Sequence, residues 1–207
     1  MSNLIITISR EFGSGGRLAG EKLAKELGIQ FYDKEIIRIT AEKSGLSPEF
    51  IEDNEERVNN NFLFSVATAA YPDFNYVPQY DVPINEKTFI AQANVIKELA
   101  GQGSCVIVGR CADYILRAQE KLLRVFIRSE IADRTRRIAE EYQMEEEAAE
   151  KRIARNDKNR ANYYRHYTGN DWGSMKNYDL TINTGFCGVD GAVEIIKAAL
   201  RAKGYIE

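Results

Sequence analysis

The chain has 207 residues, which is long enough for one compact domain with a good hydrophobic core. Its net charge of −3 argues against a general nucleic-acid-binding protein, because binding a phosphate backbone requires a basic face. The three cysteines are widely spaced and the only histidine is His166, so the sequence excludes a structural zinc site.

The first part of the chain alternates short apolar runs with helical patterns. Residues 4–8, LIITI, form a continuous β-branched run that is typical of a strand buried on both faces of a parallel sheet. The loop GSGG follows, and then a helix over about 16–27, whose Ala19, Leu23 and Leu27 recur every four residues. The run IQFYD predicts a second short strand, and a second helix follows it.

The alternation continues after one irregular region. Residues 44–85 are rich in proline and aromatic residues, so we expect an inserted region that covers a site. The later elements that the sequence predicts are a helix over about 86–100, a strand in SCVIVGR, a strand over 122–128, helices over 131–142 and about 145–160, a strand in YDLTINT and a closing helix. Strands that alternate with helices and are mostly apolar throughout indicate a three-layer α/β sandwich around a parallel sheet.

The loop SREFGSGGR has the glycines of a phosphate-binding loop but not its lysine. In the P-loop pattern G-x-x-x-x-G-K-[ST], backbone N–H groups and the lysine bind phosphates, and the hydroxyl binds magnesium. When the pattern is aligned on the GSG of residues 13–15, Gly16 takes the lysine position and Arg17 the hydroxyl position. Arg10 then stands in place of the first glycine, so the match is incomplete.

Other interpretations of this loop fit no better. A shift by one residue puts Arg17 at the lysine position but puts Glu11 at the first glycine. A dinucleotide-binding fingerprint requires a third glycine where Leu18 stands. A glycine-rich turn without a ligand is the remaining alternative. We expect a phosphate-binding loop in which the Arg17 guanidinium replaces the charge of the lysine.

Three later segments carry arginines at positions that suit an anionic ligand. VIVGRCADYIL places Gly109 and Arg110 at the end of a buried strand, where open α/β sheets bind ligands. RSEIADRTRRI starts a helix with acidic residues followed by arginines. KRIARNDKNRANYYRHY sets Arg152 and Arg155 three residues apart on one helix face. Together with the glycine loop and NYDLTINTG, these segments resemble the cytidylate kinase family, in particular its cytidylate kinase-like branch, over essentially the whole chain.

The resemblance implies a P-loop nucleoside-monophosphate-kinase fold with a sheet of about five strands. It implies one domain over 1–207, with an acceptor-binding region at about 44–85 and an arginine-bearing lid at about 145–175. The activity it implies is transfer of the γ-phosphoryl group of ATP to a small phosphorylated acceptor, with a nucleoside monophosphate as the favoured acceptor. Mg²⁺ would accompany the ATP.

The resemblance also assigns site residues. The residues expected to bind the ATP phosphates are Gly13, Ser14, Gly15, Gly16 and Arg17. Those expected to bind the acceptor are Asp33 and Arg110. The expected catalytic arginines are Arg17 and the lid residues Arg152 and Arg155, and Mg²⁺ would contact Ser14, Asp33 or both. Cys111 stands where the family has an aspartate, and region 44–85 has no cytidine-binding pattern. We therefore expect the phosphotransfer architecture to carry over, without the cytidine specificity.

Several of these residues have an alternative role that involves no ligand. Arg110 could pair with a surface carboxylate, and Arg134 and Arg137 could be exposed residues of a helix. The lid arginines could form salt bridges on a solvated helix. Asp33 could be the N-cap of a helix that begins at Lys34. For the whole protein, a non-catalytic nucleotide-binding protein and a kinase of another small molecule stay open.

The predicted partners are ATP and its acceptor, with neither nucleic acid nor membrane. No apolar run approaches the roughly 20 residues that cross a bilayer, and no signal-peptide pattern precedes the first strand. Three scattered cysteines suit a reducing compartment. We therefore expect a protein of the cytoplasm.

Overall fold

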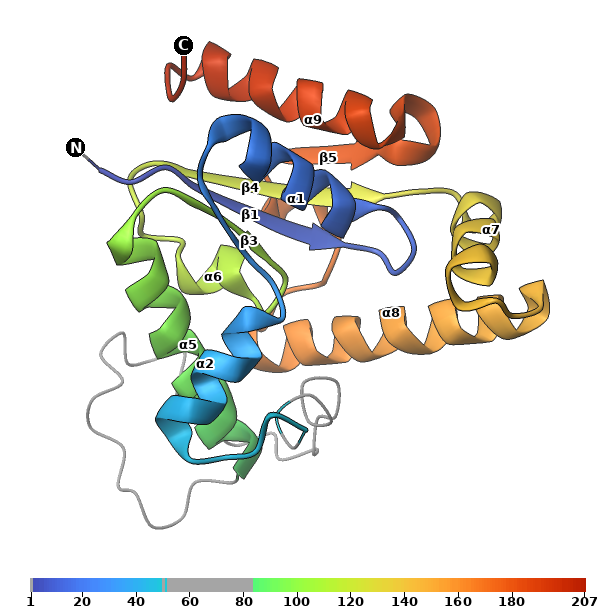
Figure 1. Ribbon diagram of the computed structural model, residues 1–207, viewed down its shortest axis with the longest axis horizontal. Helices are drawn as coiled ribbons and strands as arrows, with labels where there is room; N and C mark the ends of the chain where they lie inside the picture. The colour runs from blue at the N-terminus through green and yellow to red at the C-terminus, as the bar shows by residue number, and fades with distance from the viewer. Residues whose placement is uncertain (1, 50, 52–83) are drawn as a thin grey trace.

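The computed structural model describes residues 2–49, 51 and 84–207 (Figure 1). Its centre is a parallel sheet of five strands in the order β2-β3-β1-β4-β5. The strands are β1 (Ile5–Arg10), β2 (Gln30–Tyr32), β3 (Cys105–Val108), β4 (Leu122–Arg128) and β5 (Leu180–Asn183). This confirms the predicted parallel α/β fold. Most of the predicted insert, about 44–85, lies outside the described residues.

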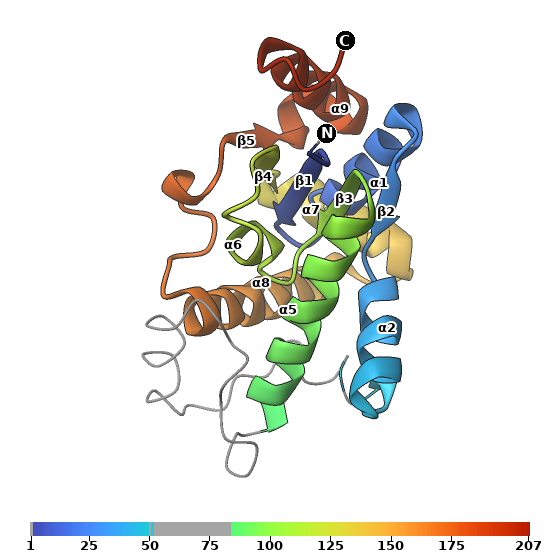
Figure 2. The ribbon, with the colours of Figure 1, turned by 90° about the vertical axis from the view of Figure 1, so that its left-hand side faces the viewer.

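Helices cover both faces of the sheet, which gives the three predicted layers. They are α1 (Gly16–Leu27), α2 (Glu35–Ser44), α5 (Ile84–Gln102), α6 (Ala112–Ile115), α7 (Ile131–Tyr142), α8 (Glu146–Thr168) and α9 (Thr184–Ala202), with a short 3₁₀-helix η1 (Met175–Asn177). Helices α1 and α9 lie on one face of the sheet, and α5, α6 and α8 lie on the other (Figure 1). Helix α2 packs on α5 (Figure 2). None of these described helices has the length and apolarity to cross a membrane.

One helix boundary was predicted wrongly. Helix α8 was expected to end near residue 160, but it continues to Thr168 and ends at Gly169, whose φ is 71°. The extra turns carry Tyr164, which is buried, so tertiary packing stabilises a stretch that has no strong helical period.

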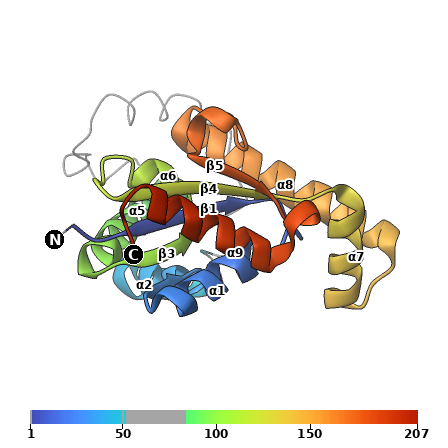
Figure 3. The ribbon, with the colours of Figure 1, turned by 90° about the horizontal axis from the view of Figure 1, so that it is seen from above.

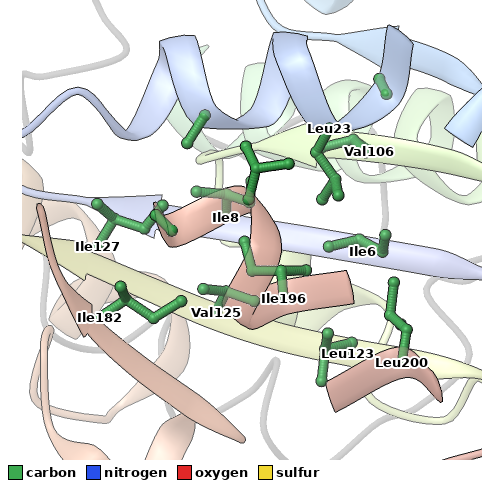
Figure 4. Close-up of a cluster of buried hydrophobic side chains, with 14 of the residues drawn as sticks. Ile6, Ile8, Leu23, Val106, Leu123, Val125, Ile127, Ile182, Ile196 and Leu200 are labelled. Carbon is green, nitrogen blue, oxygen red and sulfur yellow. The ribbon is translucent and has the colours of Figure 1, made fainter. Parts of the chain in front are cut away.

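The continuous apolar runs arise because both faces of each central strand are buried. In β1, Ile6 and Ile8 contact the layer of α1 and α9, whereas Ile5 contacts the layer of α5 and α6. All three are fully buried, and burial of such a side chain contributes about 1.5–3 kcal/mol. Figure 4 shows the core under α1 and α9, including Ile6, Ile8, Leu23, Val106, Leu123, Val125, Ile127, Ile182, Ile196 and Leu200.

The site follows from the direction of the strands. Because all five strands are parallel, their carboxyl ends meet at one edge of the sheet. Strand β1 leads there into the glycine loop, and β3 leads into Gly109. Helix α7 lies beyond the ends of β1 and β4 (Figure 3). Loops and helix ends from distant parts of the sequence therefore converge at this edge.

Candidate active site

The glycine loop turns through two residues in the left-handed region. Gly13 has φ 78° and Gly15 has φ 79°, values that residues other than glycine rarely adopt. A Cβ atom on Gly13 would lie 2.9 Å from Cγ1 of Ile138, and one on Gly15 would lie 3.0 Å from Cγ2 of Val189. Helix α1 begins directly after this turn, so its first N–H groups and the positive end of its dipole face an anion-binding position.

Ser14 anchors the loop to the protein interior. It is fully buried, and its carbonyl oxygen accepts a hydrogen bond of 2.6 Å from Oγ1 of Thr184 at the start of α9. Its hydroxyl accepts from the N–H of Gly16 at 3.4 Å. Ser14 therefore fixes the shape of the loop from behind, while its glycine neighbours face the cavity.

A cavity of about 660 Å³ opens in front of the loop, within the range of typical ligand sites. Its walls come from the loop, the start of α1, the β2–α2 connection, α7 and α8. The charged residues that line it are Arg10, Glu11, Arg17, Asp33, Lys34, Arg110, Arg137, Glu141 and Arg160. Cations outnumber carboxylates at these walls, so the cavity suits an anionic ligand.

A smaller cavity of about 90 Å³ adjoins the first at the end of β3. Arg10, Arg110 and Arg160 line both cavities. The remaining residues that line the smaller cavity are Ser9, Gln92, Gly109, Cys111, Tyr163, Tyr164 and Trp172. Three arginines thus lie where the two spaces meet.

Two of the predicted site residues are in direct contact. Nε of Arg17 donates to Oδ2 of Asp33 at 2.9 Å, and its Nη1 donates to Oε2 of Glu21 at 3.2 Å. Nε of Arg110 donates to the carbonyl oxygen of Asp33 at 3.3 Å. Asp33 is not the helix cap that it could have been: the N-cap of α2 is Lys34 and no side chain caps it. The Asp33 carboxylate instead binds Arg17, which holds the two cavity residues together.

Arg134 and Asp157 connect the loop with both helices beyond the sheet. Nη1 of Arg134 donates to Oδ2 of Asp157 at 2.5 Å and to the carbonyl oxygen of Phe12 at 3.3 Å. The N–H of Phe12 donates to the other Asp157 oxygen at 2.7 Å. Arg134 is only 9% exposed, so the interpretation of Arg134 as a surface residue was wrong. The arginine-rich start of α7 was the signal for this role.

Two further arginines bind loop carbonyls from the same helices. Nη1 of Arg137 on α7 donates to the carbonyl oxygen of Gly13. Nη1 of Arg160 on α8 donates to the carbonyl oxygen of Arg10 at 3.1 Å. Both guanidiniums line the main cavity. The interpretation of Arg137 as an exposed helix residue therefore gives way to a position beside the phosphate loop.

The two predicted lid arginines differ in position. The Arg152 guanidinium lies 3.7 Å from the ring centre of Tyr142, which lines the main cavity. Arg155 is exposed and lines neither cavity. Arg152 therefore contacts Tyr142, a residue of the cavity wall, without lining the cavity itself, and Arg155 lies on the surface.

The aromatic residues of α8 pack against α5 and α6. The rings of Phe89 and Tyr167 stack with centres 3.9 Å apart, and the hydroxyl of Tyr164 donates to Oδ2 of Asp113 at 2.6 Å. Burial raises the pKa of Asp113, and burial raises the pKa of the Cys111 thiol well above its usual value. A buried, protonated thiol is a poor nucleophile, so Cys111 contributes packing.

Three carboxylates line the cavity and could contact a magnesium ion, those of Glu11, Asp33 and Glu141. In kinase sites Mg²⁺ is held mainly by substrate phosphates and by one or two carboxylates. Asp33 lines the cavity and fits this role, whereas the buried hydroxyl of Ser14 is already engaged within the loop. Within residues 2–49, 51 and 84–207, no three His, Cys, Asp or Glu side chains are grouped to hold a metal ion. The residues thus fit a metal that arrives with its nucleotide.

Comparisons with known proteins agree with this geometry. The cytidylate kinase-like family matches residues 5–185. A cytidylate kinase of Thermococcus kodakarensis is 27% identical, over 95% of this chain and 88% of the relative. A cytidylate kinase of Methanothrix thermoacetophila is 29% identical, over 96% of this chain and 99% of the relative.

Solved structures show the same architecture. An uncharacterized protein from Eubacterium ventriosum has a TM-score of 0.70 at 28% identity, covering 96% of this chain and 98% of its own. Shikimate kinase from Bacteroides thetaiotaomicron has a TM-score of 0.54 at 13% identity, covering 97% of this chain and 99% of its own. At that identity the second likeness concerns the kinase fold alone.

Proposed function

Because the chain belongs to the cytidylate kinase-like family, we propose that it transfers the γ-phosphoryl group of ATP to a nucleoside monophosphate. The family and the kinase fold support a nucleotide kinase. One observation carries the finer proposal. A glycine loop with a helix start opens on one cavity, a second cavity adjoins it, and arginines line the junction of the two.

The donor phosphates would bind at the glycine loop. The N–H groups of the loop glycines and of the first turn of α1 would bind the β- and γ-phosphates. Ser14 would hold the loop in shape, since its side chain is buried, its N–H donates to the carbonyl oxygen of Glu11 and its carbonyl oxygen accepts from Thr184. Arg17 at the cavity wall would add positive charge, and Asp33 would hold its guanidinium in place and help to hold Mg²⁺.

The phosphate of the acceptor would bind where the smaller cavity adjoins the main one, because about 90 Å³ is too little for a whole nucleotide. Arg110 follows β3 and lies at the junction of the two spaces, where it would bind the acceptor phosphate. Asp33 would orient Arg110 through its carbonyl oxygen. Arg152 would approach the transferred group from the wall formed by Tyr142, and Arg155 would join it if α8 closes over the donor.

The reaction asks little covalent chemistry of the protein. An oxygen of the acceptor phosphate forms a bond to the γ-phosphorus, and the bond from that phosphorus to the β–γ bridging oxygen breaks. The bridging oxygen leaves with the electron pair on ADP, and no net proton transfer is required. Mg²⁺, when bound with ATP, supplies charge neutralisation at the phosphates. The arginines position the two anions and offset their repulsion.

A ligand panel tests this proposal. Thermal unfolding is followed with ATP, ADP and each nucleoside monophosphate, with and without Mg²⁺, because a ligand of the native state raises the unfolding temperature with its occupancy. Cytidine monophosphate comes first in the panel, since the relatives above are named cytidylate kinases. We expect stabilisation by ATP–Mg²⁺ and by at least one monophosphate, with formation of the diphosphate. Stabilisation by nucleotide without turnover on any acceptor would favour a binding protein instead.

A further inference from the structure

Two departures of the loop from the P-loop pattern are coupled in space. Arg10 stands at the first glycine of the pattern and Gly16 stands at the lysine. A Cβ atom on Gly16 would lie 2.6 Å from Cβ of Arg10 and 3.1 Å from its Cγ. A separation below 3 Å between such atoms requires the backbone to move. An arginine at position 10 therefore leaves no room for a lysine at position 16.

The Arg10 side chain continues from Gly16 to the acceptor side of the site. A Cβ atom on Gly109, directly after β3, would overlap Nη1 of Arg10. The stem of Arg10 thus lies against the start of α1, and its guanidinium lies over the end of β3. Arg10 lines both cavities, and Arg160 fixes its backbone by donating to its carbonyl oxygen at 3.1 Å. This places a guanidinium between the donor loop and the acceptor cavity.

We propose that Arg10 supplies the positive charge that a lysine supplies in other P-loop kinases, and that Arg10 and Gly16 form one coupled replacement. The inference rests on the proposed function, because it assumes phosphates in the main cavity. Arg17 is less suited to this role, because its side chain is 51% exposed and lines only the main cavity, whereas Arg10 lines both cavities. A guanidinium carries five N–H donors in a fixed fork, so Arg10 can contact a donor and an acceptor phosphate together.

Charge and packing are separated by two single variants. Arg10→Met keeps an unbranched stem against Gly16 and removes the charge, whereas Arg10→Lys keeps both stem and charge. ATP–Mg²⁺ affinity is measured by calorimetry, and diphosphate formation is measured with the best acceptor. We expect Arg10→Met to weaken ATP binding at least tenfold and Arg10→Lys to recover most of that loss. The control is Arg201→Gln, an exposed arginine in the last turn of α9, which should behave as wild type.

The coupled replacement has its own test. Gly16→Lys alone should lower the unfolding temperature sharply, because Arg10 occupies the space. Arg10→Gly with Gly16→Lys restores the first glycine and the lysine of the P-loop pattern, with Arg17 still at the hydroxyl position. This double variant should be more stable than Gly16→Lys alone and should bind ATP–Mg²⁺ within about tenfold of wild type. This variant also serves if Arg10→Met fails to fold: a folded double variant that binds no ATP would overturn the inference.

The outcomes separate the inference from the proposed function. If the wild type neither binds ATP nor forms a diphosphate, the proposed function fails and the charge role of Arg10 fails with it. If the wild type does both and Arg10→Met matches it, only the inference is wrong. If Gly16→Lys is as stable as wild type, the steric coupling is wrong whatever the ligand.

Discussion

Arg134 on α7 and Asp157 on α8 form a largely buried ion pair with an N–O distance of 2.5 Å, and Asp157 also accepts a hydrogen bond from the N–H of Phe12. Their side chains are 11% and 18% exposed. The middle of the segment predicted as a lid is therefore hydrogen-bonded to the residue before the glycine loop. Any closure of α8 over a ligand must either carry Arg134 and Phe12 with it or break these hydrogen bonds.

Removal of the Asp157 carboxylate should destabilise the protein. Asp157→Ala leaves the Arg134 charge poorly solvated and without this partner, and we expect a loss of about 2–3 kcal/mol in the free energy of unfolding. Urea unfolding measures it. Asp171→Ala is the matched control, because Asp171 is 71% exposed in its pair with Arg165 and should cost under about 0.5 kcal/mol. Equal losses in the two variants would show that the Arg134 pair has no special role.

The buried carboxyl of Asp113 predicts a pH dependence. Burial raises its pKa in the folded state, so between the unfolded and folded pKa values the folded protein binds more protons. The free energy of unfolding should therefore fall as the pH rises through this window. Asp113→Asn keeps an oxygen that accepts from the Tyr164 hydroxyl and lacks this titration. We expect its stability relative to wild type to improve from about pH 4 upward, and parallel curves from urea unfolding would contradict this.

Two glycines with positive φ, Gly15 in the phosphate loop and Gly28 at the end of α1, allow the cost of backbone strain to be separated from the cost of a steric clash. Gly15→Ala introduces a side chain at φ 79° and a contact of 3.0 Å with Val189. Gly28→Ala introduces one at φ 65° with no heavy atom within 4 Å. We expect the Gly28 variant to lose about 1 kcal/mol with unchanged ATP affinity, and the Gly15 variant to lose more stability and at least tenfold in ATP affinity. Equal ATP affinity in both variants would show that the glycine loop does not bind the ATP phosphates.

Arg17 should contribute less to ATP binding than Arg10. Arg17→Ala removes one cavity charge whose guanidinium already binds Asp33 and Glu21, so we expect ATP affinity to fall by at most about tenfold. Arg17→Lys should recover part of the loss. Calorimetric titration against Arg10→Met decides the order, and a larger loss in the Arg17 variant would restore Arg17 to the lysine's role.

The fold could be predicted because its signals are local. Strands buried on both faces appear in the sequence as unbroken apolar runs. The glycine loop is recognisable because it lies between such a run and a helical pattern. Gly13, Gly15, Arg17, Asp33 and Arg110 were singled out this way, and the structure places all of them at the main cavity wall.

The remaining site residues depend on contacts between distant segments. Arg160 binds the carbonyl oxygen of Arg10 across 150 positions of sequence, and Arg137 binds that of Gly13 across 124. Neither contact leaves a local pattern. From the sequence alone, Arg10 was only a mismatch to the P-loop pattern. Its proposed role depends on its contact with Gly16, which only the structure shows. Ser14 was expected to contact Mg²⁺, yet its side chain is fully buried behind the loop.

The most direct test of the account is a single-turnover assay with ATP labelled at the γ-phosphate. Purified wild-type protein is mixed with labelled ATP, Mg²⁺ and each nucleoside monophosphate in turn, and the labelled products are separated. We predict that label passes to one monophosphate as its diphosphate, and that Arg10→Met lowers the rate at least a hundredfold while Arg201→Gln does not. Label that stays on ATP with every acceptor, in a protein that binds ATP, would contradict a kinase with a lysine-free loop.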